Sequence, residues 1–472
     1  MWNKPKTMKD GFLIGGGFML VGLLLQLIAG PMVWEAFAWP INGLMLAGFL
    51  TVIIGMHLKR KKSYVFRFFA TYQAAIPALI YAVVLTIIMG VTRQDSHGTW
   101  LNNMLTFWPF VLTYVYIALI LGVAVMKRLS QLRHHRTIRD FAFLLNHLGL
   151  FIAMTTATLG SADMQRLRMI TVVGEPEWRA LTQENVIRQM PLTIELKQFI
   201  METYDDGKPK RFASEIQILT KSGKNIEATV DVNKPVEVEG WKIYQYGYDT
   251  QMGAMSQTSV LELISDPWLP CVYTGIYMML AGVLLLLVYT RWSYKRLLPI
   301  GLLVVAALCI VSHFMPVIRS TNLVPALQSP WFTPHILVYI VCYSLMGAAA
   351  ILAIVLLVKK QTHASHPFPL TSQLDNLVYV GLIFMTFGMM FGAFWAKEAW
   401  GHYWSWDPKE TWAAITWFAY LVYIHYRQWP KQKPRLALWL LILSFALLQM
   451  CWWGINYLPA ALGASVHTYS TW

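Results

Sequence analysis

The chain has 472 residues, of which 56% are apolar and 13% are charged. Ordinary soluble domains are roughly 45–50% apolar and about 25% charged, so this composition excludes a soluble enzyme of the usual kind. The formal net charge of +14 would suit a nucleic-acid partner if it were clustered on a polar domain. Residues 161–268, the most polar stretch, contain 12 Lys and Arg against 16 Asp and Glu. The positive excess therefore belongs to the apolar remainder, and we expect no nucleic-acid site.

Apolar segments recur along the whole chain, and each is long enough to cross a hydrocarbon core of about 30 Å at 1.5 Å per helical residue. The first segment has no clear small-residue cleavage site and is followed by further spans, so we expect a retained helix. The sequence predicts a mainly α, polytopic membrane bundle of about 11 spans. The predicted spans are 12–30, 38–58, 72–92, 107–126, 141–160, 269–290, 297–318, 335–358, 376–395, 411–427 and 436–453.

Lys and Arg are distributed unevenly over the connections between these spans. When alternate connections are assigned to opposite sides of the membrane, 22 Lys and Arg lie on one side, counting the N-terminus and Arg427 at the end of its span, and four lie in the short loops opposite. Because positively charged loops stay in the cytoplasm, this asymmetry predicts a cytoplasmic N-terminus and an extracytoplasmic C-terminus. It also predicts that residues 161–268 lie outside the cytoplasm.

Residues 161–268 differ in pattern from the spans. The stretch RFASEIQILTKSGKNIEATVDVNKPVEVEGWKIYQYGYD, at 211–249, alternates apolar and polar residues, with Ser-Gly, Asn-Lys-Pro and Glu-Gly between the runs. Alternation with a period of two, bounded by turn residues, is typical of strands. We expect one small extracytoplasmic β-rich domain.

The densest aromatic group follows the span at 376–395, where five tryptophans fall within 18 residues of the sequence WAKEAWGHYWSWDPKETW. Tryptophan often anchors helices at membrane interfaces, and this reading holds for any one of them. Trp400, Trp404 and Trp406, however, lie in one short polar turn, where little anchoring is needed. A flat apolar ligand with polar edges explains this turn better.

The same turn ends in Asp407-Pro-Lys-Glu410. An aspartate followed by proline at the first helical position and glutamate at the third is a capping box. It predicts that a helix begins here and that Asp407 and Glu410 fix the loop relative to that helix.

Two histidines are expected at the outer surface. His335 opens a span directly after Pro334, and His467 lies in LGASVHTYSTW near the end of the chain. Two neutral imidazoles beside an aromatic platform meet the requirement for axial ligation of a haem iron. Alternatively, each of these two histidines is an ordinary polar residue at the membrane interface. His402 is a third outer candidate that this scheme does not need.

Two other histidines are expected at similar depth near the inner leaflet. His425 follows Asp407 by 18 residues, or about 27 Å along a helix, and His147 lies about 21 Å below the outer end of its span. Ionisable side chains inside membranes are costly and usually functional. A second bis-histidine site is therefore one hypothesis, and two histidines bonded to backbone near the cytoplasmic surface are the other.

Several of these segments resemble a known protein family. WGHYWSWDPKETWAAITWFAYLVYIHYR, at 400–427, resembles the tryptophan-rich WWD signature of the CcsA haem-handling proteins of cytochrome c maturation system II. With His335 upstream and VHTY at 466–469, this resemblance covers roughly residues 270–472. FLLNHLGLFIAMTTATLGS, at 143–161, resembles the histidine-bearing span of their partner CcsB, also called ResB, and VNKPVEVEGWKIYQYGYD resembles its sheet. The whole is similar to a fused CcsBA protein.

The resemblance implies three parts. Residues 1–60 would form two N-terminal transmembrane helices without an assigned role. Residues 61–268 would form the CcsB/ResB-like part, with three transmembrane helices and the β-rich segment 161–268. Residues 269–472 would form the CcsA-like haem-handling domain, with its WWD loop at 395–411.

The resemblance also implies roles for individual residues toward haem b, which is both substrate and bound ligand. The implied axial ligands of the haem iron are His335 and His467 at an outer site, and His147 and His425 at an inner site. The implied porphyrin contacts in the WWD loop are Trp400, Trp404, Trp406 and Asp407.

The activity that the resemblance implies is that of a cytochrome c haem lyase, or synthase, in the bacterial inner (plasma) membrane. Haem would be exported and presented to the CxxCH motif of apocytochrome c, whose thiols form thioether bonds. A thioredoxin-like thiol reductant would keep those thiols reduced. The alternative is a bis-histidine haem-carrying protein for membrane electron transfer or haem transport, without ligase activity.

Overall fold

The computed structural model describes residues 7–59, 64–95, 97–98, 100–132, 137–289, 322–359 and 370–461. Ten long helices lie within these ranges and correspond to ten of the predicted spans. The remaining predicted span, 297–318, lies outside the described residues, as does His467. The long helices are α1 (Met8–Ala29), α2 (Ile41–Leu58), α4 (Tyr72–Val91), α5 (Trp108–Leu132), α6 (Ile138–Gly160), α7 (Leu269–Tyr289), α10 (Phe332–Val358), α11 (Leu370–Trp400), α12 (Pro408–Gln428) and α13 (Pro434–Trp452).

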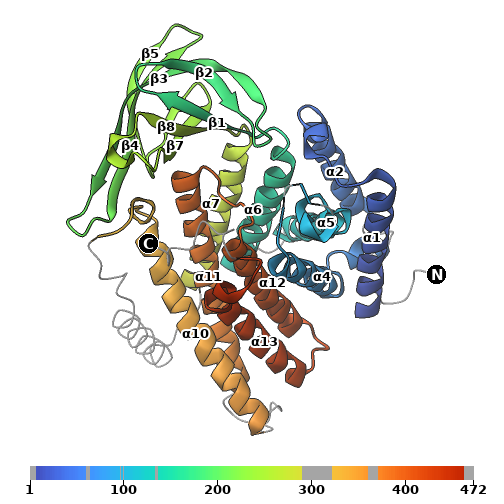
Figure 1. Ribbon diagram of the computed structural model, residues 1–472. Coiled ribbons are helices and arrows are strands. Elements are labelled where there is room, and N and C mark those ends of the chain that lie inside the picture. The colour runs from blue at the N-terminus through green and yellow to red at the C-terminus, as the bar shows by residue number, and fades with distance from the viewer. Residues whose placement is uncertain are drawn as a thin grey trace.

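Nine of these ten helices are long and apolar enough to cross a membrane. The tenth, α12, is more polar, but most of its side chains are buried. It packs against α4 and α13 near the centre of the bundle (Figure 1). Its polar residues are thus enclosed by other helices rather than by lipid, and the predicted polytopic α bundle is confirmed.

An antiparallel sheet of eight strands lies at one end of the bundle (Figure 1). The strand order is β5-β4-β3-β2-β1-β8-β7-β6, so the first and last strands pair at the middle of the sheet. Contacts of β5 with β6 and β7 show that the sheet curls until its two edges approach each other. The strands are β1 (Gln165–Val172), β2 (Pro176–Leu181), β3 (Ile187–Thr203), β4 (Pro209–Thr220), β5 (Asn225–Asp231), β6 (Val236–Val238), β7 (Trp241–Tyr248) and β8 (Thr258–Ser265).

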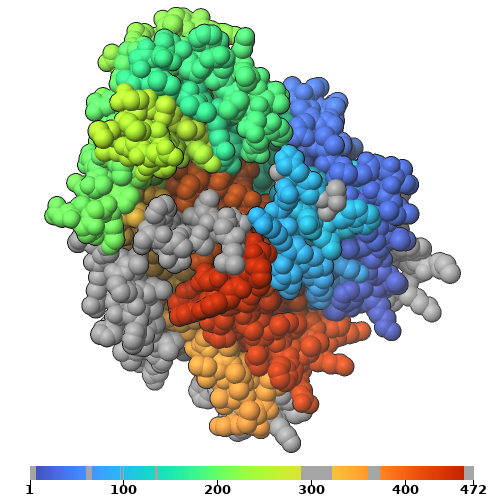
Figure 2. Space-filling model, viewed as in Figure 1, coloured from blue at the N-terminus to red at the C-terminus, as the bar shows by residue number. Residues whose placement is uncertain are grey.

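Alternation along the strands explains this sheet. In β1, Leu167 and Met169 are buried while Arg168 between them is exposed, and in β3 Ile194 and Leu196 are buried in the same way. Side chains of one parity from all eight strands form one core, and the opposite parity faces away from that core. The predicted β-rich domain is confirmed. Figure 2 shows this domain, in green, resting on the helical part of the chain.

Helices α6 and α7 approach each other closely, because glycines line their seam. A Cβ atom on Gly149 would lie 2.6 Å from the carbonyl oxygen of Gly275, and one on Gly275 would lie 2.6 Å from the carbonyl oxygen of Gly149. Small residues that bring backbones together are a common way for helices to associate in membranes. Since His147 is two residues before Gly149, this close contact also fixes the position of His147 relative to α7.

Gly149→Ala should therefore lower stability, with the overpacking costing about 1–3 kcal/mol. The matched control is Gly48→Ala in α2, because nothing lies within 4 Å of its added Cβ. Alanine there should be neutral or slightly stabilising, as it favours helix over glycine. Thermal denaturation of both variants in detergent would compare them. Equal midpoints would show that the seam tolerates a methyl group.

A carboxylate joins three helical segments where α6 meets the sheet. Asp163 accepts hydrogen bonds from the backbone N–H of Trp39 at 2.7 Å, from Asn42 Nδ2 at 2.8 Å and from the indole N–H of Trp268 at 2.6 Å. Burial opposes the charged form, but these three donors lower the pKa of Asp163 below its usual value. The ionised side chain thus ties α2 and the start of α7 to the end of α6.

Candidate functional site

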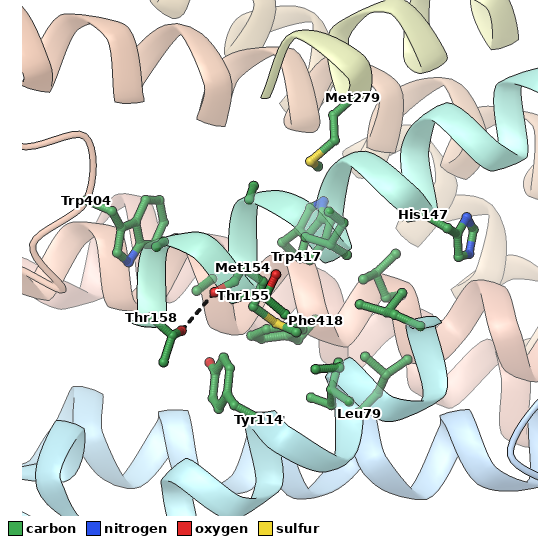
Figure 3. Close-up of a pocket in the computed structure, with 18 of the residues that line it drawn as sticks. Leu79, Tyr114, His147, Met154, Thr155, Thr158, Met279, Trp404, Trp417 and Phe418 are labelled. Carbon is green, nitrogen blue, oxygen red and sulfur yellow. Dashed lines mark hydrogen bonds between the residues drawn. The ribbon is translucent and has the colours of Figure 1, made fainter. Parts of the chain in front are cut away.

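A cavity of about 2330 Å³ lies among α4, α5, α6, α7, α11 and α12. Ordinary ligand pockets enclose roughly 300–1,000 Å³, so this space could hold a large ligand in more than one position. Its walls are mostly apolar. Figure 3 shows Trp404 at one end and His147 toward the other, with Tyr114, Trp417 and Phe418 between them.

His147 on α6 and His425 on α12 both line this cavity. Nδ1 of His147 lies 2.9 Å from the carbonyl oxygen of Phe143, and Nδ1 of His425 lies 2.8 Å from that of Leu421. Because a carbonyl oxygen only accepts, Nδ1 carries the proton in both rings and the lone pair is on Nε2. This is the tautomer that metal-ligating histidines adopt when their other nitrogen is bonded to the backbone.

Two tryptophans of the aromatic loop line the other end of the same cavity. Trp404 and Trp406 meet edge to face, with their ring centroids 5.7 Å apart. Trp406 also packs edge to face on Phe110 and Tyr114 of α5, at 5.9 and 6.1 Å, which docks the loop onto the first half of the chain. The indole N–H of Trp404 is buried without a hydrogen-bond partner in the described part of the chain. An acceptor on a ligand could satisfy it.

Trp400 and His335 belong to a different group. The ring centroids of His335 and Trp395 are 5.7 Å apart, and those of Trp395 and Trp400 are 5.5 Å apart. Nδ1 of His335 lies 2.8 Å from the carbonyl oxygen of Gly388, so its lone pair is also on Nε2. His335 is not among the described residues that line the large cavity. The structure therefore divides the predicted aromatic platform into two parts.

A smaller cavity of about 450 Å³ lies between the aromatic loop and the sheet. Trp400, His402 and Trp406 line it from the loop, and Arg166 and Arg168 line it from β1. Trp406 is thus shared by the two cavities. His467, the predicted partner of His335, lies outside the described residues, so the outer pair stays a prediction.

Asp407 caps α12 as the sequence predicts. Its carboxylate accepts a hydrogen bond from the backbone N–H of Glu410 at 2.8 Å, and the Glu410 carboxylate accepts one from the backbone N–H of Asp407 at 3.3 Å. The Glu410 carboxylate also accepts the backbone N–H of Ser405 at 2.7 Å, which holds the turn that carries Trp404 and Trp406. The capping box is confirmed, and it fixes the loop to the helix.

Asp407→Asn should keep most of the protein's function, because an asparagine side chain also accepts the hydrogen bond that caps the helix. Asp407→Ala should cost about 0.5–2 kcal/mol of local stability. The measurement is the thermal stability of both variants, together with their yield of mature cytochrome c, the product that the sequence resemblance implies. If Asp407→Asn is as defective as Asp407→Ala, the carboxylate acts directly on a ligand or substrate, and capping is not its main role.

The sequence analysis overlooked Lys397, which is only 3% exposed although it lies in α11. Its Nζ donates to the carbonyl oxygen of Gly401 at 2.9 Å and lies 3.8 Å from Asp266, just before α7. Burial raises the pKa of Asp266, and the neighbouring ammonium group opposes that rise. The pair links the aromatic loop to the end of the sheet. The predicted span ends at residue 395, so the sequence places Lys397 in a polar loop, and only the extension of α11 to Trp400 in the structure shows that it is buried.

Comparison with known proteins identifies two families along the chain. Residues 136–258 match the ResB-like family, and residues 268–462 match the Cytochrome C assembly protein family. The cytochrome c biogenesis protein CcsA of Chlorella vulgaris is 32% identical over 272 residues, which cover 47% of this chain and 84% of that protein. CcsA of Prochlorococcus marinus strain AS9601 is 32% identical over 238 residues, covering 42% of this chain and 74% of that protein. CcsA of Guillardia theta is 36% identical over 181 residues, covering 32% of this chain and 58% of that protein.

Proposed function

Because the chain belongs to the CcsA family of cytochrome c biogenesis proteins and joins it to a ResB-like part, as in the fused CcsBA proteins of system II, we propose that it carries haem across the membrane and attaches it to apocytochrome c. Haem is taken up at the inner leaflet, where His147 and His425 hold the iron. It then reaches the aromatic loop, where His335 and His467 are the outer ligands. The attachment of haem to a CxxCH motif makes this protein a holocytochrome c synthase.

One observation carries the proposal: a single mostly apolar cavity is lined toward one end by two imidazoles whose Nδ1 atoms face backbone carbonyl oxygens, and at the other end by two tryptophans of the aromatic loop. A porphyrin is flat and apolar, and its iron needs only two axial ligands from the protein. A metal ion held by side chains alone needs three or four. No cluster of three or more His, Cys, Asp or Glu suited to a metal ion occurs within the described ranges, so a pair of imidazoles fits haem better than a free ion.

The attachment chemistry needs no nucleophile from this chain. Each cysteine thiol of the CxxCH motif adds across one vinyl group of haem, so that sulfur bonds to one vinyl carbon and the thiol hydrogen goes to the other. The protein contributes orientation, ligation of the iron and exclusion of water. Trp404 and Trp406 would hold the porphyrin face, and Trp400 would contact it from the side of His335. A thioredoxin-like partner would keep the substrate thiols reduced.

The proposed setting is the bacterial inner (plasma) membrane, with the N-terminus in the cytoplasm. The excess of 22 over four Lys and Arg on alternate connections supports this orientation. The sheet and the C-terminus would then be extracytoplasmic, on the side where apocytochrome c folds. Haem would move outward through the cavity toward that side.

Co-expression with an apocytochrome c, in a bacterial strain that lacks its own maturation system, tests the proposal. We expect covalent haem on the cytochrome, detected by peroxidase stain after denaturing electrophoresis. A cytochrome whose CxxCH is changed to SxxSH is the control and should stay unstained. If this chain binds haem but leaves the wild-type cytochrome unstained, it is a haem carrier or electron-transfer protein, and the ligase proposal is wrong.

A further inference from the structure

The end of the large cavity near His147 and His425 is lined by three cationic side chains. Lys127 and Arg128 come from the end of α5, and Arg139 comes from the start of α6. Of the three, Arg128 has an ion pair with Asp140 at 3.2 Å. Asp140 also accepts hydrogen bonds from Thr137 in the cap of α6, so its charge is shared. The mouth of an otherwise apolar cavity therefore carries an excess of positive charge in the described part of the chain.

Arg128 is directly coupled to the inner histidine site. Its guanidinium carbon lies 4.7 Å from the centre of the Phe143 ring, and the Phe143 ring stacks on the His147 ring at 3.8 Å, with 19° between their planes. A cation, a benzene ring and an imidazole thus follow one another in a row. A ligand whose iron is bound by Nε2 of His147 would have one edge within reach of this guanidinium.

Arg128 also has unused hydrogen-bonding capacity. Its Nη1 contacts Asp140 and lies 3.4 Å from Oε1 of Gln131, whereas its Nε is buried without a partner among the described residues. An unsatisfied buried donor is costly, and a guanidinium has five N–H groups in a planar fork that suits carboxylates. The missing partner is therefore best explained as an anionic acceptor that enters with a ligand.

We propose that Arg128, with Lys127 and Arg139, binds the propionate groups of haem while His147 and His425 hold the iron. This inference rests on the proposed function and adds the direction in which the substrate lies. Haem carries its two propionates on one edge and its vinyl groups away from that edge. With the carboxylates held at the cationic mouth, the vinyl-bearing part points along the cavity toward Trp404 and Trp406. Haem thus approaches the aromatic loop with its reactive groups leading.

The full-length protein, stripped of haem and reconstituted in phosphatidylcholine nanodiscs, allows a direct test. It is titrated with haem and with haem dimethyl ester, in which both carboxylates are esterified, and binding is followed by the Soret absorbance. We expect the wild type to bind the ester at least tenfold more weakly than haem. Arg128→Gln should lose about tenfold in affinity for haem and little for the ester. The ratio of the affinity for haem to the affinity for the ester should therefore fall toward one.

Two further variants test whether positive charge and the shape of the guanidinium group both contribute. Arg139→Gln should reduce the ratio in the same direction, and Arg128→Lys should keep part of it, because the charge remains without the planar fork. The matched control is Arg435→Gln, an exposed arginine at the start of α13 that does not line the cavity; its ratio should equal that of the wild type.

The possible failures are distinguishable. An unchanged haem-to-ester ratio in both Arg128→Gln and Arg139→Gln, with a six-coordinate spectrum retained, would overturn the propionate assignment and leave the proposed function intact. An Arg128 effect that appears only in nanodiscs with phosphatidylglycerol, and is equal for haem and ester, would assign these cations to lipid phosphate and also overturn it. A wild-type protein that binds neither compound would instead refute the proposed function.

Discussion

His147→Ala and His425→Ala should each remove most of the haem that we expect the purified protein to carry. The wild type should show a b-type, six-coordinate, low-spin spectrum, because the two rings line one cavity from different helices and both keep the lone pair on Nε2. Replacing either ring leaves one axial position without its protein ligand. We expect haem occupancy below about a tenth of the wild-type value, measured by pyridine haemochrome assay.

The control for these variants is His97→Ala, since His97 is exposed in the loop after α4 and far in sequence from either ligand. It should keep wild-type haem content. Imidazole added during purification should partly restore the spectrum of His147→Ala, because it can occupy the vacated axial position. Colourless wild-type protein from haem-replete cells would refute the inner site altogether.

The helices and the sheet could be predicted because their signals are local. Apolar length alone indicated ten helices that the structure contains, and Asp407-Pro-Lys-Glu410 indicated where α12 begins. Alternation indicated the strands. The pairing of β1 with β8 could not be read in this way, because these strands are about 90 residues apart and no turn sets their register. Tertiary packing decides it.

The sequence allowed the depth of each site residue in the membrane to be predicted, but not which residues face the same cavity. Counting residues along α6 and α12 gave His147 and His425 similar depths, and they do line one cavity. The same counting could not reveal that Trp404 and Trp406 share that cavity, or that Trp400 turns away from them toward Trp395. Helical rise measures distance along an axis, whereas the space between helices depends on how α4, α5, α6 and α12 pack.

Contacts between charged side chains and their partners on other elements were also beyond reach from sequence. Arg128 on α5 meets Phe143 on α6 only because these two helices pack together. Lys397 on α11 meets Asp266 only because α11 packs near β7 of the sheet. Each is a charged residue in or beside an apolar span, which is a reason to suspect function. Their partners, however, appear only in three dimensions.

His335→Ala should reduce the yield of mature cytochrome c to below about a tenth of the wild-type value while haem stays bound at the inner site. His335 lies in the separate group with Trp395 and Trp400, and it does not line the cavity that contains His147 and His425 among the described residues. Its loss therefore removes the proposed outer ligand without touching the inner pair. The two readouts are covalent haem on a co-expressed cytochrome and the b-type spectrum of the purified variant.

Gly392 provides a second variant that moves this ring without removing it. A Cβ atom on Gly392 would lie 2.8 Å from Cε1 and 3.0 Å from Nδ1 of His335, so Gly392→Ala should displace the imidazole from the carbonyl oxygen of Gly388. The matched control is Gly347→Ala on α10, where the added Cβ would meet only ordinary contacts, the nearest at 3.6 Å from Phe445. Added imidazole should partly rescue His335→Ala, where the axial position is open, but not Gly392→Ala, where the displaced ring still fills the space. Full cytochrome maturation by His335→Ala would remove His335 from the set of haem ligands.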